Sequence, residues 1–271
     1  MSSIHPTAVI DSAAELGADI EIGAHCVIDG PVKLGDGNRL LPNVTIMGHT
    51  TIGQGNVFYP GSVIGAPPQD LKHHGEVTRL EIGDENHFRE HVTVHPGTEV
   101  GGSLTTVGSR NLLMVGSHVA HDCRVGSGVV LANHVLLAGH VVVHDRAILN
   151  GAAALHHFTT VGRFAYVGGL TRITQDVHPF TIVEGHPARV RACNTIGLQR
   201  AGVGPEDVEI VKSAVRTILV SDKHSAADAM AQVEAEHPDH ALVGELLASI
   251  RASNAGRQGR AAEGERSVHS S

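Results

Sequence analysis

Large apolar side chains recur at every sixth position along most of this 271-residue chain. Three runs keep the spacing: first Ile4, Ile10, Leu16, Ile22, Ile28, Leu34, Leu40, Ile46, Ile52, Phe58 and Ile64; then Ile82, Phe88 and Val94; then Val107, Leu113, Val119, Val125, Leu131, Leu137, Val143, Leu149, Leu155, Val161, Val167 and Ile173. A period of six fits neither the roughly 3.6-residue period of an α-helix nor strand alternation, and it is typical of parallel β-helices. Three such hexads make one triangular coil of about 18 residues, so we expect roughly eight or nine stacked coils over residues 1–180.

The repeat is interrupted twice, by residues 66–79 and by residues 96–106. A solenoid that ejects a polar loop from its wall usually does so on a binding face. The first loop carries a group of charged and imidazole side chains: Asp70, Lys72, His73, His74 and Glu76. A solvated loop without function would have a similar composition, so the composition does not distinguish the two interpretations. The loop is a candidate binding element because of its position in the repeat.

The pattern changes after Ile173. From Pro205 the apolar residues recur at intervals of three and four, which is the spacing of one helical face, and proline is favoured at a helix start. Two further helices are predicted over residues 225–236 and 239–252. We therefore expect a small C-terminal α-helical domain over residues 181–253. Residues 254–271 are rich in Gly, Ser and charge, and we expect them to be disordered.

The composition limits the class of protein. The chain has five phenylalanines, two tyrosines and no tryptophan, whereas an ordinary globular core buries many aromatic rings. Its 32 glycines suit a fold with a corner every few residues. The net charge of −8, without a long basic run, argues against a nucleic-acid partner.

Three features of the sequence predict the compartment. Cys26, Cys123 and Cys193 are widely separated and lack CxxC spacing, which favours a reducing environment over a disulfide framework. The N-terminal residues lack the charged and apolar regions of a signal peptide. No stretch approaches the roughly 20 apolar residues of a membrane span. We expect a cytoplasmic protein without membrane insertion.

Five of the 21 histidines are spaced so that the coils would bring them near one edge: His118, His121, His140, His156 and His157. His121 and His140 are 19 residues apart and His140 and His157 are 17 apart, each close to one coil. Polar corner residues without function are one interpretation, and we expect it to hold for His25, His49 and His134.

Two chemical interpretations of the histidine face remain. Imidazole is the commonest metal ligand, so the group could hold a metal ion shared between subunits. Alternatively, one histidine is a general base, and Asp122 favours this for His121 because an adjacent carboxylate fixes the tautomer of an imidazole. The spacing alone does not distinguish a metal site from a general base.

Several motifs resemble one family of hexapeptide-repeat enzymes. The stretch SRNLLMVGSHVAHDCRVG (109–126) is similar to the signature of the UDP-N-acetylglucosamine O-acyltransferase family, which begins lipid A synthesis. Further similar elements follow in order: QDLKHHGE (69–76), EHVTVHPGT (90–98), LAGH (137–140), LHHF (155–158) and QDVHPF (175–180). The resemblance covers both loops and the C-terminal helices.

The resemblance implies a left-handed parallel β-helix that forms a homotrimer with active sites between adjacent subunits. It implies transfer of an (R)-3-hydroxyacyl group from acyl carrier protein to the 3-hydroxyl of UDP-N-acetylglucosamine. No metal and no cofactor are implied, because the acyl group arrives activated as a thioester. Arg189, Arg191 and Arg200 form the local basic group that would suit an acidic carrier protein.

The resemblance also implies roles for individual residues. His121 matches the general base, Asp122 the carboxylate that orients it, and the backbone N–H of Gly139 the oxyanion donor. Asp70 and Lys72 match residues that hold the sugar and the acyl hydroxyl. The other matched substrate positions are Gln69, His118, His140, His156, His157, Gly169, Asn194 and Arg200. Among these, Gly169 would leave room for a longer acyl chain, and Asn194 and Arg200 would meet the nucleotide.

Three positions depart from the family pattern, and they concern nucleotide binding rather than acyl transfer. Ile196 stands where an acidic residue is frequent, Ala201 where a second arginine is common, and His157 in place of glutamine. Alternative functions are acyl transfer to a 3-amino UDP-sugar, the related N-acyl transfer of the same pathway, a γ-carbonic-anhydrase-like metal enzyme, and a non-catalytic trimeric scaffold.

Overall fold

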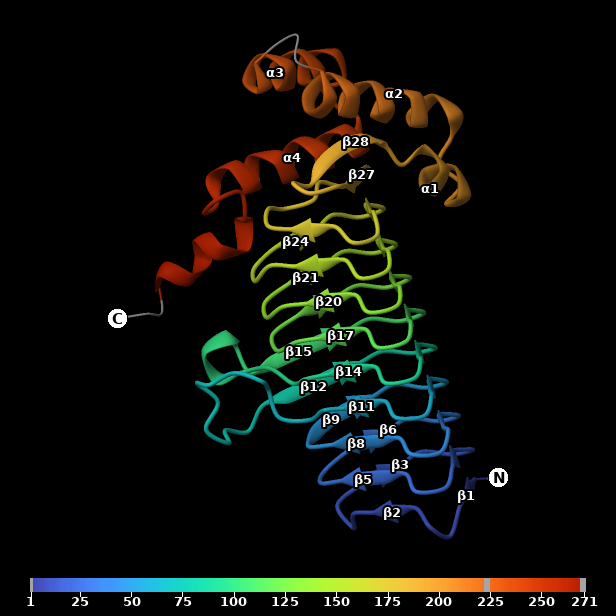
Figure 1. The fold of residues 1–271 in the computed structure, drawn as a ribbon. Coiled ribbons are helices and arrows are strands. Elements are labelled where there is room, and N and C mark those ends of the chain that lie inside the picture. The colour runs from blue at the N-terminus through green and yellow to red at the C-terminus, as the bar shows by residue number, and fades with distance from the viewer. Residues whose placement is uncertain (1, 222–224, 269–271) are drawn as a thin grey trace.

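The chain folds into a parallel β-helix with helices at its C-terminal end (Figure 1), in a computed structural model that describes residues 2–221 and 225–268. Each coil adds one short strand to each of three sheets, which have 11, nine and eight strands. The coils stack upward from β1 (Ser3–Ile4), and the helices close the upper end in the view of Figure 1.

The strands fall into three sheets, called A, B and C here. In order of pairing, sheet A contains β1, β4 (Glu21–Ile22), β7 (Arg39–Leu40), β10 (Val57–Phe58), β13 (His87–Phe88), β16 (Leu112–Leu113), β19 (Val130–Leu131), β22 (Ile148–Leu149), β25 (Tyr166–Val167), β27 (Thr181–Glu184) and β28 (Arg189–Cys193). Sheet B contains β2 (Val9–Ile10), β5 (Val27–Asp29), β8 (Thr45–Met47), β11 (Val63–Ile64), β14 (Thr93–Val94), β17 (His118–Val119), β20 (Leu136–Leu137), β23 (Ala154–Leu155) and β26 (Arg172–Ile173). Sheet C contains β3 (Glu15–Leu16), β6 (Lys33–Leu34), β9 (His49–Ile52), β12 (Arg79–Ile82), β15 (Leu104–Val107), β18 (Arg124–Val125), β21 (Val142–Val143) and β24 (Thr160–Val161).

The register between coils follows the repeat. Glu21 pairs with Arg39 and Leu112 with Val130, so neighbouring strands are offset by 18 residues. The first loop ends at Arg79, where β12 begins. The second loop contains the 3-10 turn η1 (Glu99–Gly101), and β15 begins at Leu104, inside the interruption predicted over 96–106. Both insertions leave the coil and return to it, because β9, β12 and β15 still pair in parallel.

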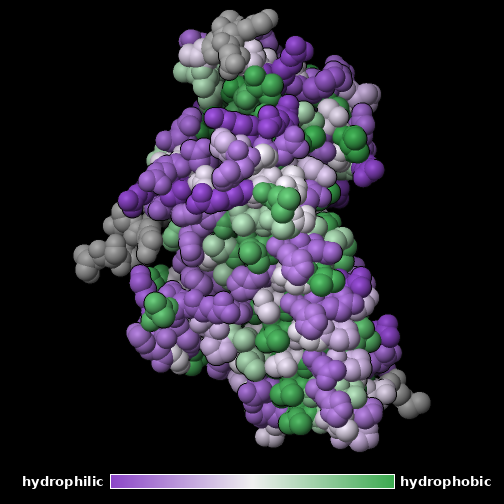
Figure 2. All heavy atoms as spheres, viewed as in Figure 1, coloured by the Kyte–Doolittle hydropathy of each residue, from purple (hydrophilic) through white to green (hydrophobic). Residues whose placement is uncertain are grey.

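The predicted repeat residues form the core. Ile46, Leu113 and Leu137 are fully buried in one cluster that runs along the helix axis. Figure 2 shows apolar residues only in small groups among polar ones on the outer surface of the coils. Ile4 differs, with 47% of its surface exposed, because it lies in the first coil and has neighbours on one side only.

The C-terminal helices confirm the predicted periodicity. They are α1 (Thr195–Arg200), α2 (Pro205–Val215), the π-helical turn η2 (Arg216–Val220), α3 (Ala226–Glu236) and α4 (Ala241–Ala255). The helices have their own core, which includes Phe180, Leu198 and Val211. Sheet A continues through β27 and β28 to Cys193, so the boundary predicted at residue 181 falls inside this sheet. Within the described part of the chain, no helix is both long and apolar enough to span a membrane.

The predicted disorder from residue 254 is wrong for the described part of that segment. Helix α4 continues to Ala255, a turn follows, and the 3-10 helix η3 spans Ala261–Val268. The Arg260 side chain is only 5% exposed and donates a 2.8 Å hydrogen bond to the carbonyl of Thr174. The long-range polar contacts of this segment order it despite its polar composition. Residues 269–271, also expected to be disordered, lie outside the described residues.

Candidate active site

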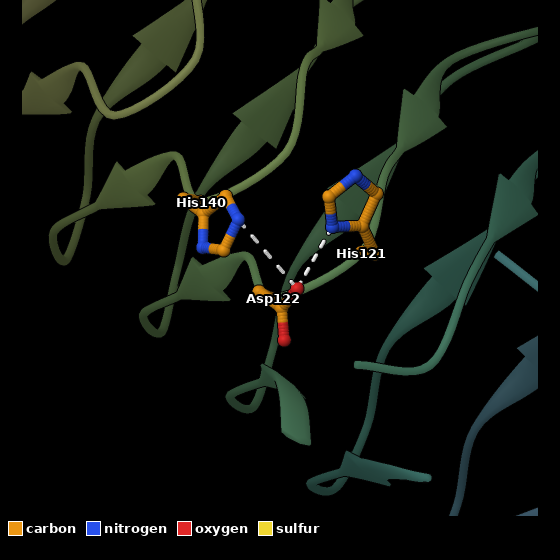
Figure 3. Close-up of side chains that lie close together, drawn as sticks. All are labelled: His121, Asp122 and His140. Atoms are coloured by element: carbon orange, nitrogen blue, oxygen red, sulfur yellow. Dashed lines mark hydrogen bonds and ion pairs between the residues drawn. The ribbon is translucent and has the colours of Figure 1, made fainter. Parts of the chain in front are cut away.

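The strongest chemical feature is the pair formed by His121 and Asp122 at the corner between β17 and β18 (Figure 3). Nδ1 of His121 lies 2.8 Å from Oδ2 of Asp122, and both residues are at least nine-tenths buried. An ionised carboxylate only accepts hydrogen bonds, so this contact places the imidazole proton on Nδ1. Nε2 of His121 is then the atom that can accept a proton.

Asp122 is held by the second loop. Its Oδ1 accepts the backbone N–H of Thr98 at 2.9 Å, and its Oδ2 accepts the Thr98 hydroxyl at 2.6 Å. Its own N–H donates to the Thr105 hydroxyl at 2.7 Å. Burial alone would raise the pKa of Asp122, but the hydrogen bonds from His121 and Thr98 outweigh it and place the pKa below its ordinary value. The carboxylate is therefore ionised at neutral pH.

Gly139 lies one coil above, against the ring of His121. A Cβ added at Gly139 would lie 2.6 Å from Nε2 of His121, so any side chain there would displace the imidazole. The backbone N–H of Gly139 makes no hydrogen bond within the residues the structure describes. An available backbone N–H in a residue packed against the imidazole is a candidate donor to an oxyanion.

His140 and Asp70 complete the immediate surroundings. Nε2 of His140 lies 3.7 Å from Oδ2 of Asp122 (Figure 3), and its ring stacks on Phe158 with centroids 4.3 Å apart. Oδ2 of Asp70, from the first loop, lies 4.0 Å from Nε2 of His121. The first loop thus brings a carboxylate to the open nitrogen of the buried pair.

Asp70, Asp122, His140 and Phe158 line a pocket of about 650 Å³, whereas His121 and Gly139 lie next to it without lining it. Four residues predicted from the sequence line it: Asp70, Lys72, Asp122 and His140. The second loop adds Thr98, Val100 and Gly101. The structure therefore brings both loops together with the histidine face, as the interruptions of the repeat predicted.

Other predicted residues surround this centre without lining the pocket. His118, on β17, pairs its Nδ1 with the Thr93 hydroxyl at 2.7 Å, and burial next to His121 lowers its pKa. His156 and His157 are exposed one coil above His140 and two above His121, and Nδ1 of His156 lies 3.0 Å from the carbonyl of His157. Gln69 is exposed on the first loop, next to Asp70.

The remaining predicted residues lie far from the pair or are engaged elsewhere. Gly169 is exposed at a corner between β25 and β26. Asn194 caps α1 with a 3.0 Å contact from the N–H of Gly197, and its amide donates to the carbonyl of Phe164 at 2.9 Å. Arg200 ends α1, which lies on the other side of the molecule from the two loops in Figure 1.

Sequence reasoning missed three residues near the pair. Thr98 and Gly101 enclose Asp122, and an added Cβ at Gly101 would collide with its carboxylate. His95 packs edge-on against His118 at 5.0 Å, and burial, with His118 and His121 nearby, lowers its pKa to about 4. The motif EHVTVHPGT contains His95 and Thr98, but the contact of His95 with His118 on sheet B and that of Thr98 with Asp122 depend on the fold.

The same group of residues bears on the predicted metal site. His121, Asp122 and His140 offer ligand atoms within 4.8 Å of one another, which could hold an ion. However, Oδ2 of Asp122 already accepts hydrogen bonds from His121 and from the Thr98 hydroxyl. The contacts are those of a carboxylate that orients an imidazole, so the geometry favours the general base.

Comparison with known proteins agrees with this chemistry. Residues 176–259 match the family model described as UDP-N-acetylglucosamine O-acyltransferase, domain 2, and residues 31–66 match that of bacterial transferase hexapeptide repeats. An acyl-[acyl-carrier-protein]–UDP-N-acetylglucosamine O-acyltransferase of Anaeromyxobacter dehalogenans is 43% identical over 254 residues, which cover 94% of this chain and 98% of that protein. The enzyme of that name from Akkermansia muciniphila is 46% identical over 257 residues, covering 94% and 99%.

Solved structures agree with the sequence comparisons. A UDP-N-acetylglucosamine acyltransferase of Bacteroides fragilis superposes with a TM-score of 0.88 at 38% identity, covering 92% of this chain and 97% of that one. The Arabidopsis enzyme superposes with a TM-score of 0.83 at 31% identity, covering 95% and 99%. The predicted fold, a left-handed parallel β-helix of hexapeptide repeats with a small C-terminal helical domain, is confirmed.

Proposed function

The chain belongs to the family of acyl-[acyl-carrier-protein]–UDP-N-acetylglucosamine O-acyltransferases, and on that premise we propose that His121 is the general base of the transfer. The enzyme transfers an (R)-3-hydroxyacyl group from acyl carrier protein to the 3-hydroxyl of UDP-N-acetylglucosamine, the first step of lipid A biosynthesis. The names of the relatives favour neither a 3-amino acceptor nor a metal enzyme. The observation that carries the proposal is the buried His121–Asp122 pair, in which Nδ1 is engaged by the carboxylate and Nε2 lies 4.0 Å from Asp70, a residue of the pocket wall.

The proposed reaction begins with a hydroxyl that is too weakly acidic to react unaided. Nε2 of His121 takes the proton as the 3-oxygen attacks the thioester carbonyl carbon. The tetrahedral intermediate collapses, the carbon–sulfur bond breaks, and the proton on Nε2 passes to the leaving sulfur, which regenerates the neutral imidazole. The products are the 3-O-acyl sugar nucleotide and the free thiol of the carrier.

The neighbours of His121 support this assignment. The imidazolium that forms during the reaction lies 2.8 Å from the ionised carboxylate of Asp122, which stabilises it. The unpaired N–H of Gly139 is our proposed donor to the oxyanion of the intermediate. Asp70 lies near Nε2, and Lys72 lines the same pocket. We propose that Asp70 holds the sugar and that Lys72 binds the acyl hydroxyl. His140, stacked on Phe158, closes the other side.

We further propose that the complete site forms between copies in a homotrimer. Asn194 and Arg200, the expected nucleotide contacts, lie at α1, away from the pocket that contains Asp70 and Asp122 (Figure 1). A single chain cannot bring these groups to one substrate, whereas an adjacent copy can. The predicted roles of His118, His156, His157, Gln69 and Gly169 in substrate contact belong to the same proposal.

The compartment and the carrier surface are also proposals. Cys26, Cys123 and Cys193 are buried free thiols, which is consistent with a cytoplasmic location. Acyl carrier protein is acidic, and Arg189, Arg191 and Arg200 are exposed at the helical end, although Arg191 also lies 3.5 Å from a carboxylate oxygen of Glu184. We propose this end as the carrier surface.

One experiment tests the catalytic assignment. Acyl transfer from a mixed set of 3-hydroxyacyl carrier proteins to UDP-N-acetylglucosamine is followed by mass spectrometry for the wild type, His121→Ala and the control His87→Ala. His87 lies outward on β13 and does not line the pocket. We expect a loss of about a hundredfold or more for His121→Ala and less than twofold for His87→Ala. Equal activity in all three proteins would disprove the role of His121, and the product mass would give the acyl length.

A further inference from the structure

The pocket extends beyond Asp122, and the C-terminal segment of the same chain lines part of it. We call residues 252–264 the roof. The roof contributes only small residues to the pocket: Ala252, Ala255, Gly256, Ala261, Ala262 and Gly264. Figure 1 shows the segment after α4 descending on the side that carries the loops before β12 and β15.

The floor beneath the roof is the outer face of sheet C. Arg124 of β18 pairs in register with Val142 of β21, which pairs with Thr160 of β24, and all three line the pocket. His144, which follows β21, lines it as well. The pocket therefore runs from Asp122 across one row of outward side chains.

The roof is fixed to the floor by the partly buried carboxylate of Asp176. Oδ2 of Asp176 accepts the N–H of Ala261 in the roof at 2.8 Å, and its Oδ1 accepts the N–H of Thr160 in the floor at 2.7 Å. The N–H of Asp176 also donates to the carbonyl of Gly259 at 2.8 Å. Because Asp176 is hydrogen-bonded to both the roof and the floor, these hydrogen bonds fix the distance between the two surfaces.

Two cationic side chains face this space without partners. Within residues 2–221 and 225–268, the side chains of Arg124 and Lys72 make neither an ion pair nor a hydrogen bond. The two carboxylates of the pocket are engaged, Asp122 with His121 and Thr98, and Asp70 with the backbone N–H of Lys72 at 3.0 Å. These hydrogen bonds do not neutralise the carboxylates, but they occupy their oxygens, so within the described residues the guanidinium of Arg124 keeps its donors available for an anionic ligand.

We propose that Arg124, with His144 on the same pocket, binds a phosphate group of a substrate whose reacting end lies at the His121–Asp122 pair. A guanidinium suits phosphate because it can donate two parallel hydrogen bonds. This inference rests on the proposed function, in which both substrates carry phosphate: the nucleotide-sugar as a diphosphate and the carrier as a phosphodiester on its prosthetic arm.

The position of Arg124 indicates which phosphate it meets. It is two residues from Asp122, so an anion held there lies close to the reacting hydroxyl. The diphosphate is attached to the same sugar ring as that hydroxyl. The phosphate of the carrier is separated from the reacting thioester by a long prosthetic arm. The diphosphate is therefore the phosphate that we assign to Arg124.

The test compares Arg124→Gln and Arg124→Lys with the control Arg110→Gln, an exposed arginine at a corner outside the pocket. Calorimetry measures the Kd for UDP and for uridine, and steady-state assays measure KM for each substrate. We expect UDP to bind Arg124→Gln about tenfold or more weakly, uridine to bind unchanged, and lysine to restore part of the loss. KM for UDP-N-acetylglucosamine should rise in proportion, with kcat changed less than threefold.

The outcomes separate the two sources of phosphate. A rise in KM for the acyl carrier, with unchanged Kd for UDP, would assign the site to the carrier's phosphate. A change below twofold in all of these constants, relative to Arg110→Gln, would overturn the proposal. Because the Kd for UDP needs no catalysis, a wild type that binds UDP but transfers no acyl group would refute the proposed function and leave the subsite testable.

Discussion

Removing the hydroxyl of Thr98 in the second loop should slow catalysis, although the general base His121 itself is unchanged. Thr98→Val keeps the β-branched shape of the side chain and the backbone N–H that donates to Oδ1 of Asp122. It removes the 2.6 Å hydrogen bond from the hydroxyl to Oδ2, the oxygen that also accepts from His121. The change therefore tests whether Thr98 positions the carboxylate that orients the base.

The expected size follows from the kind of bond. A hydrogen bond to a charged group contributes about 1.5–3 kcal/mol. A tenfold rate change corresponds to about 1.4 kcal/mol, so kcat/KM should fall by roughly tenfold to a hundredfold if the bond acts mainly in the transition state. Most of the loss should be in kcat, because Thr98 holds Asp122 rather than the sugar. Thr98→Ser, which restores the hydroxyl, should recover most of the activity.

The assay is acyl transfer at saturating carrier, with a double-mutant cycle to Asp122→Asn. If Thr98 acts through the carboxylate, adding Thr98→Val to Asp122→Asn should cost little more than Asp122→Asn alone. Thr51→Val, an exposed position on β9, is the control for the substitution itself. Thermal denaturation establishes that each variant is folded. Fully additive losses in the cycle, or unchanged kcat in Thr98→Val, would refute this reasoning.

Two further predictions follow from the geometry. Gly139→Ala should lower kcat by a hundredfold or more in the same transfer assay, because its Cβ would lie 2.6 Å from Nε2 of His121; activity within tenfold of the wild type would contradict the close packing. Burial lowers the pKa of His178 to about 4 from an ordinary value of 6.5, so the unfolded chain binds more protons than the folded one between these values, and folding stability should fall as the pH drops from 6.5 to 4. His178→Gln should remove up to roughly 3 kcal/mol of that acid destabilisation, measured by urea unfolding across this pH range; identical slopes for both proteins would exclude the effect.

The repeat made the coils predictable because each coil must present an apolar residue inward at the same place. Leu113, Leu131 and Leu149 follow one another at 18 residues and stack in adjacent strands of sheet A. The same reasoning placed His121 near His140, since a fixed coil length turns sequence spacing into spatial distance. Asp70 could be placed only by resemblance, because an inserted loop has no period.

The features that could not be predicted depend on contacts between distant segments. The Thr98 hydroxyl reaches Asp122 only because the second loop folds back on sheet C. The segment after residue 253 has a composition typical of disorder, yet Arg260 and Ala261 find partners at Thr174 and Asp176. Neither pairing leaves a local signal, since polar residues are equally common in solvated loops.

The coil corners explain why a catalytic site can be assembled on so regular a fold. Asp122, His140 and Phe158 lie 18 residues apart, and all three have left-handed backbones with φ of 59°, 63° and 64°. Such a corner turns its side chain outward, and aspartate tolerates this conformation better than most residues do. Successive corners therefore form a column in which Asp122 contacts His140 and His140 stacks on Phe158. His121 and Gly139 each precede a corner residue of this column. Position 139 must be a glycine, because a side chain there would collide with the imidazole of His121. The repeat that builds the core thus also sets the spacing of the catalytic groups, and the two loops supply what the column lacks, Thr98 to hold the carboxylate and Asp70 to face the base.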